Sequence, residues 1–328
     1  MSRYVVVGAG AVGATLAAEF DSAGIDYVLV ARGVSYRAIA DDGLRYVRPS
    51  GERTIRLRVV DGPDAVTVTT ADVLLLTVKA QQVEAAVAQW AWRSVEGSED
   101  AVAQTIPIVT FQNGLDSERT ALRRFSRVYG ASIRIPGTHV EPGVVVSAGE
   151  PSVALNWLGC FPGGIDSTAQ TIARDLGFAH IPTDVVPDIG QWKAAKLIDN
   201  LLNAVDLFRV HDADIAEIAA AVRSEAESVY AAAGIEVADY GRSALDLASL
   251  GVADIEGYSS TRRSTWQSVV RGSSVETDYL NGEIVLLGRL HGIATPVNEA
   301  LAVAANSVAE PGSRDLRAIL PHANAIPV

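Results

Sequence analysis

Cysteine is almost absent from this sequence, with Cys160 the single example among 328 residues. One cysteine excludes a disulfide within the chain and any zinc site built on several cysteines. No apolar run approaches the roughly 20 residues that cross a membrane. The first residues lack the basic start and cleavage site of a signal peptide. These absences predict a cytoplasmic protein that does not span a membrane.

Positive charge is also scarce. The chain has 27 lysines and arginines against 39 aspartates and glutamates, a net charge of −12. Such a balance argues against a general nucleic-acid binder, but it leaves room for a local basic pocket that holds an anionic substrate. The length suffices for two domains with cores of their own.

The start of the chain has the pattern of a dinucleotide-binding turn. An apolar run over residues 4–7 predicts a strand, a helical pattern follows over about 11–23, and a second strand is predicted over 27–31. Between the first strand and the helix the chain reads G-x-G-x-x-G, the turn that binds a pyrophosphate in this context. Its residues are Gly8, Ala9, Gly10, Ala11, Val12 and Gly13. The alternative is a glycine-rich turn that binds no ligand.

Each glycine of this turn has a predicted role. Gly8 allows a tight turn out of the strand, Gly10 leaves space for the pyrophosphate, and Gly13 lets the helix pack close to the sheet. The free N–H groups at the start of the helix would then face the phosphates.

The end of the second predicted strand indicates which cofactor is bound. An NAD site places an acid there, whereas this chain has Arg32, with Asp26 lying before the strand. A guanidinium suits the 2′-phosphate of NADPH, so the sequence favours NADPH over NADH. The alternative is an ordinary surface arginine.

Polar residues follow two further predicted strands. Lys79 follows the run 73–78, which is apolar apart from Thr77, and Asn113 comes just after the run 107–111. Ligands of open α/β sheets bind at the carboxyl ends of the strands, which makes both residues candidates for ligand binding. A solvated strand end and a turn asparagine before glycine are the alternatives for Lys79 and Asn113.

Beyond about residue 185 the predicted structure becomes helical. We expect a dinucleotide-binding domain over 1–185 and a helical domain over 186–328, with helices near 188–208, 212–234, 239–249, 261–271, 274–291 and 296–309. The predicted fold is therefore α/β, with an N-terminal Rossmann-type domain and an all-helical C-terminal domain. His291, before Gly292, is interpreted as the last residue of a helix rather than as a catalytic base.

The predicted helix over 188–208 carries a polar stripe. Its members follow at spacings of three, four and three and share one helical face: Lys193, Lys196, Asn200 and Asn203. They would form either an anion-binding wall or a solvent-facing stripe of an amphipathic helix.

Several motifs together resemble the ketopantoate reductase (2-dehydropantoate 2-reductase) family over nearly the whole chain. They are the glycine turn, Thr77-Val78-Lys79-Ala80, Gln112-Asn113-Gly114, Lys196-x-x-x-Asn200, Glu276-Thr277-Asp278-Tyr279-Leu280-Asn281-Gly282 and His291-Gly292-Ile293. The block that begins at Glu276, together with His291-Gly292-Ile293, is quite specific for this family, whereas the glycine turn alone is not.

The resemblance implies a set of residue roles. Arg32 matches the residue that holds the 2′-phosphate of NADPH, Lys79 a lysine close to cofactor and substrate, and Asn113 an asparagine near the nicotinamide ribose. Lys196 matches the general acid that protonates the new hydroxyl, and Glu276 the acid that positions substrate and lysine. Substrate-binding positions are matched by Asn200 and Ser264.

One position departs from the family pattern. Where the family has a second asparagine, eight residues after the catalytic lysine, this chain has Ala204, and the nearest amide is Asn203. On an α-helix one residue turns a side chain by roughly 100°, so a substrate contact would be lost or reshaped. The reaction type is therefore better supported than the substrate.

The sequence thus predicts an NADPH-dependent enzyme that reduces ketopantoate to pantoate, without a metal ion. One alternative is a relative that reduces another 2-oxo acid, and a second is a redox sensor that binds NADP without turnover. The predicted partner is a small 2-oxo acid, with no nucleic acid and no membrane, and a homodimer is left open.

Overall fold

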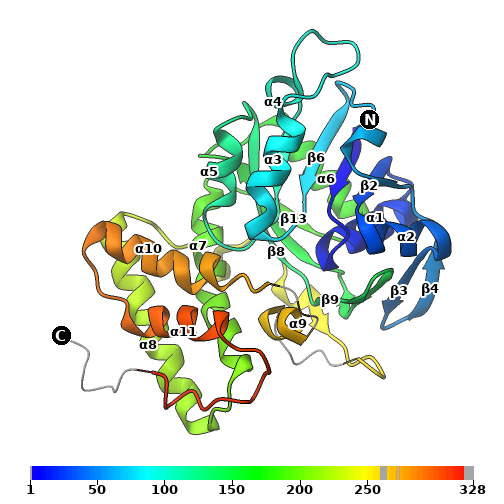
Figure 1. Cartoon of the computed structure of the whole chain (residues 1–328). Coiled ribbons are helices and arrows are strands. Elements are labelled where there is room, and N and C mark those ends of the chain that lie inside the picture. The colour runs from blue at the N-terminus through cyan, green and yellow to red at the C-terminus, as the bar shows by residue number, and fades with distance from the viewer. Residues whose placement is uncertain (1, 259–263, 271, 273, 321–328) are drawn as a thin grey trace. The chain divides into compact units, whose positions relative to one another are not determined.

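The computed structural model describes residues 2–258, 264–270, 272 and 274–320 (Figure 1). Contacts within the chain divide these residues into two compact units. Unit 1 holds the described residues of Met1–Gln112, Asp116–Ile189 and Asp239–Ser260, and unit 2 those of Asn113–Leu115, Gly190–Ala238 and Thr261–Val328. The predicted domain boundary between residues 185 and 186 stays a prediction.

An eight-stranded sheet forms the centre of unit 1. Its strands in spatial order are β13 (Thr183–Val185), β12 (Leu155–Cys160), β8 (Val128–Arg134), β7 (Ile108–Thr110), β6 (Asp72–Leu76), β1 (Arg3–Val7), β2 (Tyr27–Ala31) and β5 (Val59–Asp61). Neighbouring strands run parallel except β8 and β12. The chain builds from β1 out to β5 and then returns to the other side of β1 with β6. The strand order therefore reverses between β1 and β6, the point at which such sheets bind ligands.

Two smaller sheets complete the strands of unit 1. One has the order β4 (Gly51–Ile55), β3 (Leu44–Arg48), β10 (Val144–Ser147) and β9 (Gly137–Glu141), and the other pairs β11 (Gly149–Pro151) with β14 (Leu250–Val252). Tyr46 of β3 and Val145 of β10 share a hydrophobic core with the first helix, so the four-stranded sheet covers that helix.

Helices pack on both faces of the large sheet. Tyr4 and Val6 of β1 point into a core shared with α1 (Ala11–Ala23) and α6 (Ser167–Phe178). Val5 and Val7 point into a second core on the opposite face, as the period of a strand requires. That second face is covered by α3 (Val83–Ala91), α4 (Val102–Thr105) and α5 (Ser117–Leu122), of which α3 and α5 lie side by side (Figure 1). The remaining helical elements of unit 1 are α2 (Gly33–Asp42), η1 (Pro63–Ala65) and η2 (Ala80–Gln82).

The helix predicted over 239–249 is wrong. This stretch contains two short 3₁₀ helices, η4 (Tyr240–Arg242) and η5 (Leu247–Ser249), followed by β14. Asp239 and Asp246 each accept a backbone N–H two residues on, which closes a tight turn in place of a longer helix. The Ser243 hydroxyl accepts the indole N–H of Trp157 at 2.9 Å, so the segment packs on the sheet of unit 1.

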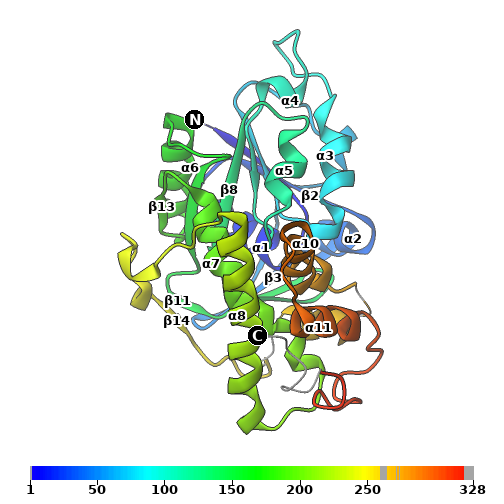
Figure 2. The ribbon, with the colours of Figure 1, turned by 90° about the vertical axis from the view of Figure 1, so that its left-hand side faces the viewer.

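Helices around one apolar core make up unit 2 (Figures 1 and 2). They are α7 (Ile189–Asn200), η3 (Leu201–Leu207), α8 (Asp212–Ala233), α9 (Ser264–Val270), η6 (Thr277–Tyr279), α10 (Asn281–His291) and α11 (Pro296–Asn306). The helix predicted over 188–208 therefore changes from α to 3₁₀ after Asn200. His291 ends α10 before Gly292, as predicted. No helix in the described part of the chain is long and apolar enough to cross a membrane.

A buried polar network joins four helices of unit 2. Glu225 of α8 accepts the backbone N–H groups of Val297 and Asn298 at 2.8 and 3.0 Å, and the side-chain amide of Asn298 at 2.7 Å. Asn281 donates to the side-chain oxygen of Asn298 and to the carbonyl of Leu201, both at 3.0 Å. Since the N-cap of α11 makes no side-chain bond of its own, Glu225 caps this helix from a neighbouring one.

Replacing Glu225 with glutamine is expected to lower the free energy of unfolding by about 1–3 kcal/mol. In glutamine an NH₂ group replaces one of the two carboxylate oxygens. This group cannot accept the hydrogen bonds that the oxygen accepted, so buried N–H groups of α11 lose their partner. Urea denaturation of the variant measures the loss. The exposed Glu227 lies one half-turn further on the same helix, and Glu227→Gln is the matched control. Equal stability losses in the two variants would contradict the capping role.

Candidate active site

The glycine turn has the geometry that its sequence predicts. Gly8 has a φ of +114°, which side-chain-bearing residues rarely adopt. A Cβ atom on Gly13 would lie 1.9 Å from the carbonyl oxygen of Gly8 and 2.4 Å from the hydroxyl of Thr77. The start of α1 therefore lies against the end of β1 at a distance that only glycine permits.

Open space lies beside the middle glycine. A Cβ atom on Gly10 would meet nothing within 4 Å. Gly10 is the N-cap of α1, which has no capping side chain and no acidic residue in its first turn. These features fit the pyrophosphate of a dinucleotide, because the helix start offers N–H groups, positive potential and room.

Two further side chains brace this turn. The Thr77 hydroxyl lies 3.0 and 2.9 Å from the carbonyl oxygens of Val7 and Gly8. Gln112 donates its amide to the carbonyls of Leu76 and Val78, both at 2.8 Å. The sequence pattern alone does not predict these roles of Thr77 and Gln112. For Thr77 the available signal was its position as the one polar residue in the otherwise apolar run 73–78.

Replacing Gly13 with alanine is expected to destabilise unit 1 by about 1–3 kcal/mol, because the new methyl group overlaps the Gly8 carbonyl. Dinucleotide binding should weaken with it, since α1 must move away from the turn. Gly177→Ala is the control, because a Cβ at this α6 position meets nothing within 4 Å. Thermal unfolding and nucleotide titration of both variants measure the difference. Unchanged stability in Gly13→Ala would rule out the close-packing role.

Arg32 lies at the carboxyl end of β2 as the N-cap residue of α2. Its side chain is exposed, and its guanidinium donates a hydrogen bond to the side-chain oxygen of Gln89 on α3. Arg32 and the glycine turn thus belong to the same unit and the same edge of the sheet.

Lys79 also belongs to this edge. It follows the end of β6 by three residues, precedes η2 and is half-buried. Thr77, two residues earlier, contacts Gly8, which places this stretch beside the glycine turn.

Asn113 groups with unit 2 rather than with the glycine turn. The next residue, Gly114, has a φ of +83°, and a Cβ there would lie 2.4 Å from the carbonyl oxygen of Tyr279. Asn113 is thereby held close to the segment that begins at Glu276. Glu276 is half-buried and is the N-cap residue of η6.

The polar stripe of α7 does not face solvent as a whole. Lys193 is 4% exposed and Asn203 6% exposed, while Lys196 and Asn200 are half-buried. Asn203 donates its amide to the side-chain oxygen of Asn200 at 3.5 Å, so the structure brings these two asparagines together. Among the described residues the side-chain nitrogen of Asn200 is buried and has no hydrogen-bond partner. A polar ligand is one way to satisfy such a group.

Ala204 lies in the apolar core of unit 2 and is 1% exposed. Because α7 ends at Asn200, residues 201–207 turn by about 120° each, as in a 3₁₀ helix. The α-helical rotation per residue, which the sequence comparison of Asn203 with Ala204 assumes, does not apply to them. The amide nearest to Asn200 in this turn is that of Asn203. The side chain of Ser264, another predicted site residue, lies outside the described residues.

Residues 4–162 match the family model "Ketopantoate reductase PanE/ApbA", and residues 200–309 match its C-terminal model. The chain belongs to the ketopantoate reductase family. A 2-dehydropantoate 2-reductase of Archaeoglobus fulgidus is 28% identical over 311 residues, covering 92% of this chain and 96% of the relative.

Solved structures share the fold of this ketopantoate reductase family member. D-mandelate dehydrogenase, in a ternary structure with NADH and anilino(oxo)acetate, has a TM-score of 0.74 and 19% identity, covering 94% of this chain and 98% of its own. A dimeric ketopantoate reductase from Staphylococcus aureus has a TM-score of 0.70 and 19% identity, with the same coverage of both chains.

Family membership confirms four predictions from the sequence: the family itself, the fold class, an oxidoreductase activity and NADPH as cofactor. The enzyme reduces a 2-oxo acid with this nucleotide.

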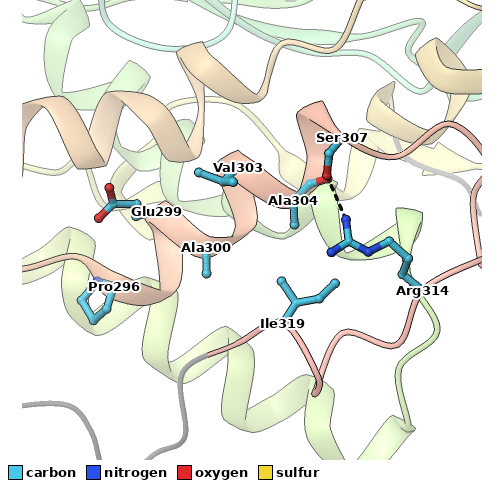
Figure 3. A pocket seen from close by; sticks show the side chains of 8 residues that line it. All are labelled: Pro296, Glu299, Ala300, Val303, Ala304, Ser307, Arg314 and Ile319. Carbon is cyan, nitrogen blue, oxygen red and sulfur yellow. Dashed lines mark hydrogen bonds between the residues drawn. The ribbon is translucent and has the colours of Figure 1, made fainter.

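A surface pocket of about 440 Å³ lies along α11 of unit 2 (Figure 3). Ala300, Val303 and Ile319 contribute apolar lining, and Arg314 donates to the hydroxyl of Ser307 at 2.9 Å. The pocket contains none of the predicted site residues, so we do not assign the reaction to it.

Proposed function

We propose that this enzyme reduces 2-dehydropantoate (ketopantoate) to pantoate with NADPH. The main support is similarity over nearly the full length to curated 2-dehydropantoate 2-reductases, together with family models that match both halves of the chain. The nicotinamide, when bound, supplies a hydride to the ketone carbon.

In this proposal Lys196 stabilises the negative charge that develops on the ketone oxygen and then donates the proton of the new hydroxyl. Solvent returns a proton to the lysine after product release. Glu276 positions the substrate and Lys196.

The small number of lysines in the chain supports the proposed role of Lys196 as a proton donor. The chain has only three lysines, Lys79, Lys193 and Lys196, and its other 24 basic residues are arginines. Arginine can supply surface charge but does not give up a proton, whereas lysine can do both. Two of the three lysines are the ones to which the family resemblance assigns a role.

The remaining roles form two groups. We assign the cofactor to Gly8, Ala9, Gly10, Ala11, Val12, Gly13, Arg32, Lys79 and Asn113. We assign the substrate to Asn113, Lys196, Asn200, Asn203, Ser264 and Glu276. The proposed domain 1–185 would hold all of these cofactor residues, and the proposed domain 186–328 all of these substrate residues except Asn113.

A different 2-oxo acid is the second candidate substrate. Ala204 replaces a family asparagine, and D-mandelate dehydrogenase, which acts on an aromatic 2-hydroxy acid, shares the fold. The Asn200–Asn203 contact would then line a substrate pocket of altered shape.

A panel of 2-oxo acids separates the two candidates. Initial rates of NADPH oxidation are measured with ketopantoate, with smaller branched 2-oxo acids and with phenylglyoxylate. The proposal predicts the highest kcat/KM for ketopantoate. A higher kcat/KM for phenylglyoxylate would show that ketopantoate is not the preferred substrate, while the reaction, reduction of a 2-oxo acid, would stay as proposed.

Two other properties remain proposals. The dimeric ketopantoate reductase from Staphylococcus aureus supports a homodimer for this chain, which the molar mass in solution tests. An NADP-binding sensor without turnover is the alternative to an enzyme of this type, and any steady turnover in the panel excludes it.

A further inference from the structure

The contact between Arg32 and Gln89 links two parts of unit 1 that are 57 residues apart in the chain. Arg32 has an extended backbone as the N-cap residue of α2, so its Cα is fixed at the end of β2. Its long side chain is exposed and would lose many conformations on binding an anion. A hydrogen bond to a second element restricts this side chain before any anion arrives.

Gln89 is well placed to act as such a holding residue. It lies on α3, whose neighbouring residues Val87 and Trp90 are 0% and 1% exposed, so the backbone at Gln89 is anchored in the core. The Gln89 side chain is exposed and accepts the Arg32 bond through its oxygen. A guanidinium has five N–H donors, and most of them stay available beside a single bond.

The chemical type of this partner is important. Glutamine is neutral, so it holds the guanidinium without cancelling its charge. A glutamate at the same position would pair with Arg32 and repel a phosphate dianion.

We infer that Gln89 is a positioning residue for nucleotide specificity, which holds Arg32 in place to bind the 2′-phosphate of the nucleotide. The inference rests on the proposed cofactor role of Arg32 and extends it to a residue on another helix.

Equilibrium binding of NADP⁺ and NAD⁺, measured by calorimetry without substrate, tests this inference. Gln89→Ala should weaken NADP⁺ binding roughly 3- to 10-fold and leave NAD⁺ binding unchanged, because only the phosphate contact depends on Arg32. Gln89→Glu should weaken NADP⁺ binding more than Gln89→Ala does. Gln170→Ala, at an exposed glutamine of α6, is the matched control and should change neither affinity.

Each other outcome has a defined meaning. If Gln89→Ala binds NADP⁺ as tightly as the parent or more tightly, the inference is overturned. Equal weakening of NADP⁺ and NAD⁺ would show a structural effect and would also overturn it. Arg32→Ala, measured in parallel, distinguishes failure of the inference about Gln89 from failure of the proposed role of Arg32. If Arg32→Ala weakens NADP⁺ and NAD⁺ binding equally, the cofactor role of Arg32 itself fails.

Discussion

Replacing Lys196 with alanine is expected to lower kcat for 2-oxo acid reduction by about 10²- to 10⁴-fold, the usual contribution of a positioned proton donor. NADPH binding should change little, because we assign Lys196 to the substrate and to proton transfer and not to the cofactor. Stopped-flow absorbance of the reduced nicotinamide measures the rate, and nucleotide titration measures binding.

Lys196→Arg provides the control for charge. Arginine keeps a positive charge near the developing oxyanion but does not release a proton at neutral pH. We therefore expect this variant to bind substrate and to remain slow. Full activity in Lys196→Arg would show that charge alone suffices, and full activity in Lys196→Ala would remove this residue from the mechanism.

Replacing Arg32 with alanine is expected to weaken NADPH binding by roughly 10- to 100-fold, the loss typical of a hydrogen bond to a charged group. NADH binding should stay the same or improve slightly, since NADH has no 2′-phosphate. The ratio of the KM for NADPH to the KM for NADH, compared between the variant and the parent enzyme, measures the effect. Loss of both nucleotides to the same extent would contradict the assignment.

Arg37→Ala is the matched control for this experiment. Arg37 is an exposed arginine on α2, five residues after Arg32, and removing it changes the net charge equally. A specific phosphate contact predicts a large change for Arg32 and a small one for Arg37. Equal effects would indicate general electrostatic attraction instead.

The sequence predicted the parts of the fold that depend on local pattern. The turn from Gly8 to Gly13 has fixed spacing and strict steric needs, and the structure reproduces each of them. The long helix α8 and the end of α10 at His291 were also predictable, because period and capping residues signal both.

Other elements were not predictable from the hydrophobic pattern, because competing local side-chain bonds or distant contacts determine them. Local side-chain bonds from Asp239 and Asp246 replace the helix predicted over 239–249, and β14 forms only by pairing with β11, about 100 residues earlier. The change from α to 3₁₀ after Asn200 coincides with the Asn281 bond to the carbonyl of Leu201, which lies 80 residues away in sequence. The bond between Arg32 and Gln89 has no sequence signal at all.

The most direct test of the account is the absorbance of the nicotinamide band when purified protein is mixed with ketopantoate and either NADPH or NADH. We predict rapid, substrate-dependent oxidation of NADPH and slow or absent oxidation of NADH. NADPH binding without oxidation would keep the fold and the cofactor and move the question to the substrate pocket near Asn203 and Ala204. Failure to bind either nucleotide would contradict the account at its first step, the glycine turn.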